Sequence, residues 1–217
     1  MNNIVKDTII LLLITLISGV GLGAVYNITK EPRKQQEEKA KNEAYQNVFP
    51  EAKTFADYND YDSDEVADYI VERDAKTKAE DKDNSNKDIN AVIDTIVTAY
   101  DNNGEILGYV ITVTDKEAYG GEVQFTVGIS NDKVIKGISF LSIDETPGLG
   151  MKANDDSYKE QFKDKAVDYV KYTKTESTDV EAVDALSGAT ITSNAVTNGV
   201  SAAIYCFDYI TGGEANE

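Results

Sequence analysis

The stretch AVIDTIVTAYDNNGEILGYVITVT, residues 91–114, decides the fold expected for this chain. It holds two apolar, β-branched runs at 92–100 and 106–114, and the Asn-Asn-Gly step between them is a typical hairpin turn signal. Two further runs of this kind follow at 123–129 and 134–141, after the turn signals Tyr-Gly-Gly and Asn-Asp. The simplest arrangement of four such runs is an antiparallel meander.

After the fourth run the chain changes to a helical pattern. Residues 155–169 have a helical distribution of charge, with Tyr158, Phe162 and Val167 as candidate core contacts. Residues 193–210 repeat apolar side chains at three- and four-residue steps, which predicts a helix with one buried stripe. The members of that stripe are Val196, Val200, Ala203, Ile204 and Phe207. Strands followed by helices indicate an α+β fold, with an antiparallel sheet and packed helices.

The amino-terminal segment is a candidate membrane anchor. Residues 8–28 carry no charge and are rich in Leu, Ile and Val, and as a helix they would extend about 30 Å, which matches a bilayer core. A cleaved signal peptide is the alternative, but the run is longer than a usual signal core and no clear Ala-x-Ala site follows it. Gly19, Gly21 and Gly23 would let a neighbouring helix pack closely, which suits a subunit of a membrane complex. We therefore expect one transmembrane helix in contact with the lipid bilayer.

A charged and polar section separates this anchor from the strands. Residues 31–48 are rich in Ala, Glu, Lys and Gln, which predicts a helical stalk that ends at Pro50. Residues 76–87 are almost wholly polar and predict a solvated loop. The expected division is an anchor over 1–30, a helical stalk and acidic linker region over 31–90, one folded domain over 91–211 and a tail over 212–217.

Acidic residues alternate at Asp60, Asp62 and Asp64. This alternation is compatible with a calcium-binding loop, but the required glycine is missing and the twelfth loop position is Val71 instead of glutamate. A charged surface is the simpler interpretation, and we expect no metal site.

The composition excludes several classes of function. The formal net charge of −18 argues against nucleic acid as a partner, because phosphate backbones bind surfaces rich in Lys and Arg. The chain has no histidine, which excludes Ser-His-Asp hydrolysis, Cys-His proteolysis and histidine-ligated zinc or haem. Cys206 is the only cysteine, so the chain alone builds no disulfide and no iron–sulfur cluster. Its place in the last apolar helix predicts a small buried side chain.

The run DALSGAT ends at Thr190 and places a hydroxyl on a tight turn of small residues, just before the last helix. Gly188 and Ala189 leave little bulk beside that hydroxyl, so a phosphate-bearing donor and a modifying enzyme could approach closely. Thr192 or Ser193 is the expected N-cap of the helix, whose free N–H groups and dipole would favour a phosphate on the hydroxyl. An ordinary turn followed by an N-cap is the alternative interpretation.

The run ETPGLG, residues 145–150, follows the fourth β-like run. Pro147 fixes its own φ and biases Thr146 toward an extended conformation, whereas Gly148 and Gly150 permit backbone angles and close approaches that other residues resist. A flat ring could rest on such a loop. A plain Pro-Gly turn that leaves a strand is the alternative.

Together these two runs resemble the FMN-binding subunits of the RnfG and NqrC family. The resemblance extends to AYGG at 118–121, to FPEA at 49–52 and to the apolar amino-terminal segment. It implies that FMN is attached covalently to Thr190 through a phosphoester bond. The other site residues that it implies are Asp184, Ser187, Gly188 and Ala189 as the modification signal, and Glu145, Thr146, Gly148, Leu149 and Gly150 as contacts of the ring or of the neighbouring backbone. Ile143 stands where family members often have a histidine, so any role of that imidazole is absent here.

The resemblance to RnfG also implies a function. It implies an electron-transfer flavoprotein, a redox subunit of a membrane-bound, ion-translocating ferredoxin:NAD oxidoreductase complex, which completes no reaction by itself. FMN would carry the redox chemistry, so no catalytic side chain is expected. The implied partners are the other membrane subunits of the complex and a flavin transferase of the ApbE type. The alternatives are an NqrC-like subunit, a solitary extracytoplasmic flavoprotein and a non-redox anchored binding module.

Charge and resemblance predict different sides of the membrane for the folded domain. Lys30, Arg33 and Lys34 follow the apolar run, whereas Lys6 before it is offset by Asp7, and positive-inside counting then favours a cytoplasmic domain. The resemblance implies the opposite side. We expect a single-pass protein of the cell membrane with an extracytoplasmic domain, because the charges after the run are mixed and large domains translocate regardless of charge.

Overall fold

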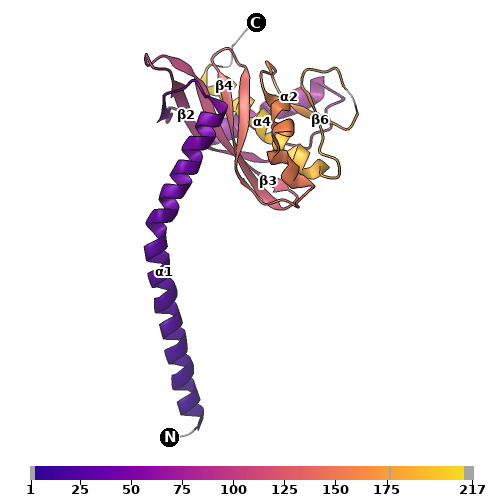
Figure 1. Cartoon of the computed structure of the whole chain (residues 1–217). Helices are drawn as coiled ribbons and strands as arrows, with labels where there is room; N and C mark the ends of the chain where they lie inside the picture. Colours follow the sequence, from indigo (N-terminus) through magenta and orange to yellow (C-terminus); the bar gives the residue numbers. More distant parts are fainter. Residues whose placement is uncertain (1–2, 176, 213–217) are drawn as a thin grey trace. The chain divides into compact units, whose positions relative to one another are not determined.

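The structure, a computed structural model, describes residues 3–175 and 177–212. They form two compact units, one up to Asn42 and one from Glu43 onward. The first is most of helix α1 (Asn3–Val48), and the second holds the described strands and the other helices (Figure 1). Residues 213–217 of the expected tail and residues 1 and 2 of the expected anchor lie outside the described residues.

Helix α1 begins in the apolar segment and continues through the charged one. Among the described residues it is the one helix long and apolar enough to cross a membrane, as judged by length and composition. The span predicted at 8–28 and the stalk predicted at 31–48 are both helical, and the helix runs through Pro32. It ends at Val48, two residues before Pro50.

The second unit contains a five-stranded antiparallel sheet in the order β1-β2-β3-β4-β5. The strand bounds are Thr54–Asp57 (β1), Ala91–Tyr100 (β2), Ile106–Ala118 (β3), Gly121–Ser130 (β4) and Ile135–Ile143 (β5). Strands β2 to β5 are the four predicted runs, and the antiparallel meander is confirmed. Strand β1 extends the sheet beyond β2 and is not predicted from the sequence, because four residues are too few to show a period of two.

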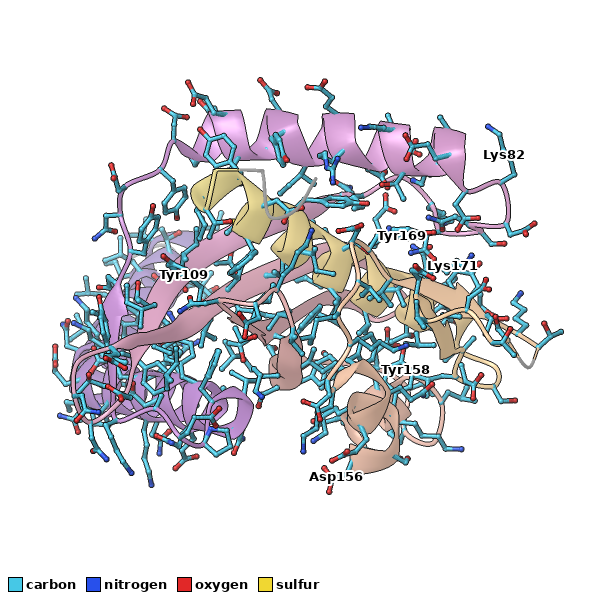
Figure 2. All side chains as sticks on the ribbon, turned by 90° about the horizontal axis from the view of Figure 1, so that it is seen from above. Lys82, Tyr109, Asp156, Tyr158, Tyr169 and Lys171 are labelled. Atoms are coloured by element: carbon cyan, nitrogen blue, oxygen red, sulfur yellow. The ribbon has the colours of Figure 1, made fainter. Side chains whose placement is uncertain are left out.

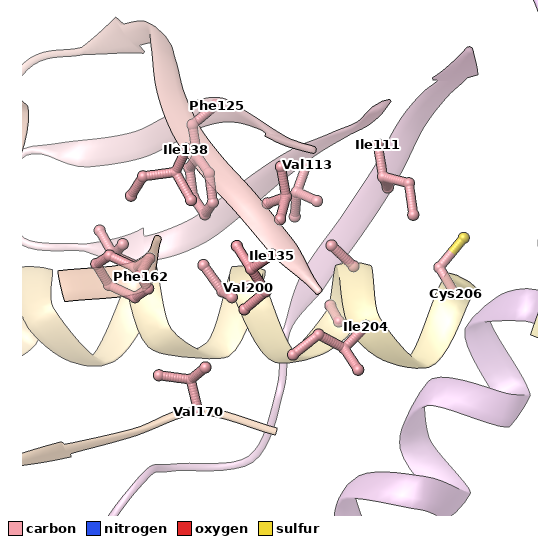
Figure 3. Close-up of a cluster of buried hydrophobic side chains, with 14 of the residues drawn as sticks. Ile111, Val113, Phe125, Ile135, Ile138, Phe162, Val170, Val200, Ile204 and Cys206 are labelled. Atoms are coloured by element: carbon pink, nitrogen blue, oxygen red, sulfur yellow. The ribbon is translucent and has the colours of Figure 1, made fainter. Parts of the chain in front are cut away.

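Helix α4 (Thr190–Ile210) packs against the sheet and supplies much of the core. Val113 and Phe125, which pair across β3 and β4, face this helix (Figure 3). Gly199 permits the close approach, because a Cβ there would lie 2.6 Å from Phe125 Cζ. The predicted stripe of α4 is buried in full. Cys206 is also buried as predicted, and burial raises the pKa of its thiol to about 12.

Helix α2 (Ser63–Glu80) belongs to this folded unit, although it lies in the section expected to be a stalk and linker over 31–90. Val66 and Ile70 are one helical turn apart and are buried in the same core as α4. Asp62 is the N-cap of α2, and its Oδ1 accepts hydrogen bonds from two backbone N–H groups of the first turn, at 2.9 and 3.2 Å. The folded unit thus begins at Glu43 rather than at residue 91.

The solvated loop predicted at 76–87 is wrong over residues 76–80, which are helical, whereas residues 81–87 form a loop in which no residue is fully buried. Helix α2 continues to Glu80, and the chain after it is tied to distant residues of the same unit. Asp81 Oδ2 accepts hydrogen bonds from Tyr169 Oη at 2.6 Å and from Lys171 Nζ at 2.7 Å. Figure 2 shows the two donors close together. The polar composition is misleading because it carries no information about partners so far along the chain.

The residues at the end of α1 pack in a second, smaller cluster of the folded unit. Tyr45, Val48 and Phe49 are buried there with Val97 of β2 and Val110 of β3. The last turn of α1 is therefore part of the folded unit that begins at Glu43.

The helix predicted at 155–169 is wrong in length. The elements over this part of the chain are η1 (Gly150–Asn154), α3 (Asp156–Lys159), η2 (Glu160–Phe162) and a parallel pair of short strands, β6 (Lys171–Thr173) and β7 (Ala182–Asp184). Asp164 takes a φ of 57°, and its N–H donates to Ile135 O at 2.8 Å. Asp164 therefore pairs with the start of β5, and the helical part of this segment ends before it, at Phe162. The three predicted core contacts are nevertheless buried; these are Tyr158, Phe162 and Val167.

Candidate functional site: a pocket at the start of helix α4

The two motif loops meet in one pocket of about 490 Å³, which we call the loop pocket. This volume lies within the range of about 300–1,000 Å³ usual for ligand and cofactor sites. Its lining comes from the β3–β4 turn, the loop after β5 and the start of α4, and consists of Tyr119, Glu145, Thr146, Leu149, Gly150, Gly188, Ala189, Thr190, Ile191 and Thr192. Tyr119, Leu149 and Ile191 are among the exposed large apolar side chains of the chain. The pocket therefore has an apolar rim.

The loop after β5 is a tight turn. The backbone N–H groups of Leu149 and Met151 both donate to Thr146 O, at 3.1 and 3.3 Å. Gly148, at the tip, has a φ of 78°, which favours glycine. Gly150 is buried and is the first residue of η1. The turn thus leaves Leu149 exposed while Gly150, the next residue, lines the pocket and is buried.

Glu145 holds the pocket together from inside. Glu145 is only 6% exposed. Its Oε1 accepts hydrogen bonds from Tyr119 N and from Thr192 Oγ1, both at 2.9 Å. One carboxylate oxygen therefore ties together all three chain segments that line the pocket. Gly150 is required beside it, because a Cβ there would lie 2.5 Å from Glu145 Oε2 and 2.7 Å from Thr192 Oγ1.

The second motif forms another turn, between β7 and α4. Ala189 N–H donates to Leu186 O at 3.0 Å, and Gly188 within the turn has a φ of 76°. Ser193 fastens the turn to the helix, because its Oγ accepts from Leu186 N at 2.9 Å and donates to Ala189 O at 3.0 Å. The small residues are thus needed for the backbone path of the turn as well as for access.

Helix α4 begins at Thr190, so the prediction of Thr192 or Ser193 as its N-cap is wrong. The N-cap is Ala189, whose side chain makes no capping hydrogen bond. The two expected capping hydroxyls are engaged elsewhere: Thr192 Oγ1 donates to Glu145, and Ser193 Oγ donates to Ala189 O. Thr190 consequently lies in the first turn of the helix and not in the loop before it.

This first turn presents unpaired donors. Within residues 3–175 and 177–212, the backbone N–H groups of Thr190, Ile191 and Thr192 donate to no acceptor, and the Thr190 hydroxyl makes no hydrogen bond. The side chain of Thr190 is half-buried and lines the pocket. Free N–H groups and the positive end of the dipole make a helix start a binding place for anions.

Seven of the ten residues predicted for the site line the loop pocket, namely Glu145, Thr146, Leu149, Gly150, Gly188, Ala189 and Thr190. The other three, Asp184, Ser187 and Gly148, are exposed and do not line it. Asp184 ends β7, where its N–H donates to Gln161 Oε1 at 2.7 Å. The lining residues that the sequence interpretation missed are Tyr119, Ile191 and Thr192. Tyr119 lies in the AYGG run already noted, whereas the other two were hidden by the expectation of a later helix start.

Two ionisable groups near these segments have shifted pKa values. Burial raises the pKa of Tyr158, whose ring packs edge-on against Phe162. Burial also raises the pKa of Asp115, on β3, to about 6. No group of three or more His, Cys, Asp or Glu side chains that could hold a metal ion occurs in the described part of the chain.

Comparison with known proteins identifies a domain family over this site. Residues 118–205 match the family model of the FMN-binding domain. All ten residues that line the loop pocket fall within this span.

Three curated relatives are G subunits of redox complexes. The relative from the proton-translocating ferredoxin:NAD(+) oxidoreductase complex of Clostridium ljungdahlii is 30% identical, over 98% of this chain and 96% of its own length. The relative from the ion-translocating oxidoreductase complex of Methanosarcina acetivorans is 28% identical, over 98% of this chain and 97% of its own length. The relative from the Na(+)-translocating ferredoxin:NAD(+) oxidoreductase complex of Acetobacterium woodii is 40% identical, over 50% of this chain and 53% of its own length.

Two solved structures are also similar. NqrC of Shewanella oneidensis has 20% identity and a TM-score of 0.45, over 54% of this chain and 61% of its own. The C subunit of the Na(+)-translocating NADH-quinone reductase of Parabacteroides distasonis has 17% identity and a TM-score of 0.44, over 71% of this chain and 95% of its own.

Proposed function

Because this chain belongs to the family of G subunits of ion-translocating ferredoxin:NAD(+) oxidoreductase (Rnf) complexes, we propose that it carries FMN covalently on Thr190 and relays electrons within such a complex. It is an electron-transfer flavoprotein subunit of a membrane oxidoreductase, anchored by α1. The bound flavin supplies the redox chemistry, since it accepts one or two electrons. The protein holds and orients it.

The availability of its hydroxyl supports Thr190 as the attachment residue. Thr192 and Ser193 have hydroxyls nearby, but both residues are fully buried and both hydroxyls donate to fixed acceptors. Thr190 as a residue is only half-buried, and its hydroxyl makes no hydrogen bond with the described residues. A modifying enzyme would therefore find one free hydroxyl in this turn of helix. This difference in availability is the observation that carries the proposal.

The start of α4 suits the phosphate of such an ester. Three backbone N–H groups, those of residues 190 to 192, have no acceptor among the described residues, and Ala189 offers no capping side chain. A charged group at a helix start gains about 0.3–1 kcal/mol from the dipole when exposed. The phosphate would thus take the place of the missing cap.

The rest of the loop pocket suits a flavin ring. Leu149 and Ile191 offer apolar surface, and Tyr119 adds an aromatic side chain. Aromatic rings stack favourably, and apolar walls with a few polar groups are usual for cofactor sites. The non-redox binding module becomes the less favoured alternative, because the FMN-binding domain match covers the whole pocket. The NqrC-like alternative is less favoured because the near-full-length relatives are G subunits.

The attachment reaction that we propose is a phosphoryl transfer from FAD by a flavin transferase of the ApbE type. The Thr190 oxygen attacks the phosphorus of the FMN half, the pyrophosphate bond breaks, and AMP leaves. The hydroxyl proton passes to a base of the transferase or to water. No electron is exchanged, so Thr190 remains a tether and not a redox group.

We place the domain on the extracytoplasmic side of the membrane, with the other membrane subunits as its partners. The covalent bond supports this side, because it prevents loss of the cofactor by dissociation. The single helix α1 also keeps the flavin at high effective concentration near partners in the same membrane.

The test compares Thr190→Val and Thr190→Ser in full-length protein produced with a matching flavin transferase. Valine keeps the β-branched shape and removes the oxygen, whereas serine keeps the hydroxyl. We expect flavin fluorescence on a denaturing gel for wild type and for the serine variant, and none for the valine variant. A fluorescent valine variant would move the attachment to another residue. A folded, exported wild type without flavin would favour the non-redox module.

A further inference from the structure

Glu145 is the one residue with a formal charge at neutral pH among the ten that line the loop pocket. It is 6% exposed, so little water screens it. None of the lining residues is Lys or Arg. A ring bound in this pocket would therefore lie close to a negative charge with no cation in the pocket wall.

The contacts of Glu145 leave half of its carboxylate open to such a ring. Both of its hydrogen-bond donors, Tyr119 N–H and the Thr192 hydroxyl, are bonded to Oε1 at 2.9 Å. Oε2 accepts no hydrogen bond from the described residues, and it lies beside Gly150, where a Cβ would come within 2.5 Å of it. Glycine at this position thus keeps the space beside Oε2 clear.

We infer that the Glu145 carboxylate lowers the reduction potential of the flavin. This inference rests on the proposed attachment of FMN at Thr190. Each electron that enters a flavin adds negative charge unless a proton accompanies it, and a nearby carboxylate makes that charge less favourable. The effect is strong in a pocket of low polarity, where charges interact more than they do in water. Glu145 then has two separable roles: Oε1 ties the pocket walls, and the charge sets the potential.

Replacing Glu145 by glutamine separates these two roles. Glutamine keeps a carbonyl oxygen that can accept from Tyr119 N–H and from Thr192, but it removes the charge. Asp144→Asn is the matched control, because Asp144 is adjacent in sequence, exposed and outside the pocket lining. It deletes the same formal charge at a site open to solvent.

The experiment is a spectroelectrochemical titration of full-length, flavin-loaded protein in detergent. We expect Glu145→Gln to shift the midpoint potential upward by at least a tenfold change in the equilibrium constant, which is about 59 mV for one electron. We expect Asp144→Asn to match wild type. Equal midpoint potentials for wild type and Glu145→Gln would overturn the inference, as would an equal upward shift in the control.

A second variant tests the inference with the opposite sign. Thr192→Val removes a hydrogen-bond donor to Oε1 and keeps the charge, so we expect the midpoint potential to fall. If Glu145→Gln does not fold, the midpoint potential of Thr192→Val tests the inference in its place. An upward shift for Thr192→Val would contradict the inference. Denaturing gels of the same samples report attachment. Flavin-free wild type would refute the proposed function, whereas loaded protein with unchanged potentials would refute only the role of Glu145.

Discussion

Replacing Asp115 by asparagine should stabilise the folded domain at neutral pH. Asp115 lies on β3, two residues after the core residue Val113, and is 1% exposed. Its Oδ1 accepts from Glu117 N–H at 2.8 Å, but Oδ2 is buried without a hydrogen-bond partner. Burial, together with the charge of Glu117, raises the pKa of Asp115 to about 6 from the usual 3.8. The ionised carboxylate is therefore costly in the folded state.

The size of this cost follows from the shift. One pKa unit corresponds to about 1.4 kcal/mol, so a shift of about two units gives an upper value of about 3 kcal/mol, and relaxation of the protein around the buried carboxylate reduces it to about 2 kcal/mol. The folded state holds the proton more tightly than the unfolded state does. Folding stability is consequently lost as the pH rises from about 4 through 6, and the cost is complete above that window.

The assay is thermal unfolding of full-length wild type and Asp115→Asn in detergent, at pH 5 and pH 8. For a domain of this size we expect the variant to melt roughly 4–8 °C higher at pH 8, and by about half that margin at pH 5. Asp132→Asn, in an exposed turn, is the control and should change neither value. A variant that is no more stable than wild type at pH 8, or a margin independent of pH, would refute the reasoning.

Three further predictions concern the pocket and the core. Gly150→Ala should lower the free energy of unfolding by about 1–3 kcal/mol and reduce flavin loading, because the added Cβ would collide with the Glu145 carboxylate. Melting curves measure the stability and gel fluorescence measures the loading. Unchanged loading would contradict the prediction. Tyr119→Ala should brighten native flavin fluorescence without changing the amount attached, because Tyr119 lines the pocket and we expect its phenol to stack on the ring and quench it. Equal brightness would place Tyr119 away from the ring. Lys133→Met should destabilise the fold by on the order of 2 kcal/mol in denaturant titrations, because buried Asp208 loses the ion pair at 2.8 Å to Lys133 Nζ and keeps only the longer one, at 3.7 Å, to Arg73. A loss below about 1 kcal/mol would contradict that prediction.

The parts of the fold that follow from local sequence were predictable. Strands β2 to β5 and the buried face of α4 follow from periods of two and of three to four residues. Elements whose bounds depend on contacts with residues far away in the sequence were not predictable. The predicted helix at 155–169 stops because Asp164 pairs with Ile135 of β5, and α2 joins the core although most of its residues are polar.

The same distinction applies to the loop pocket. The ETPGLG and DALSGAT runs identified two of its three walls, because their glycines and hydroxyl have visible chemical uses. The third wall, Tyr119, is brought in by the hydrogen bond from its N–H to Glu145. The true start of α4 depended on Thr192 preferring that same carboxylate over a capping role. Neither bond has a local sequence signal.

Peptide mass mapping of the mature protein, purified from membranes of cells that contain the flavin transferase, tests the central claim most directly. We predict one FMN ester, on the peptide that contains Thr190 and located on that residue by fragmentation. A folded, membrane-inserted protein in which this peptide carries no flavin would contradict the account.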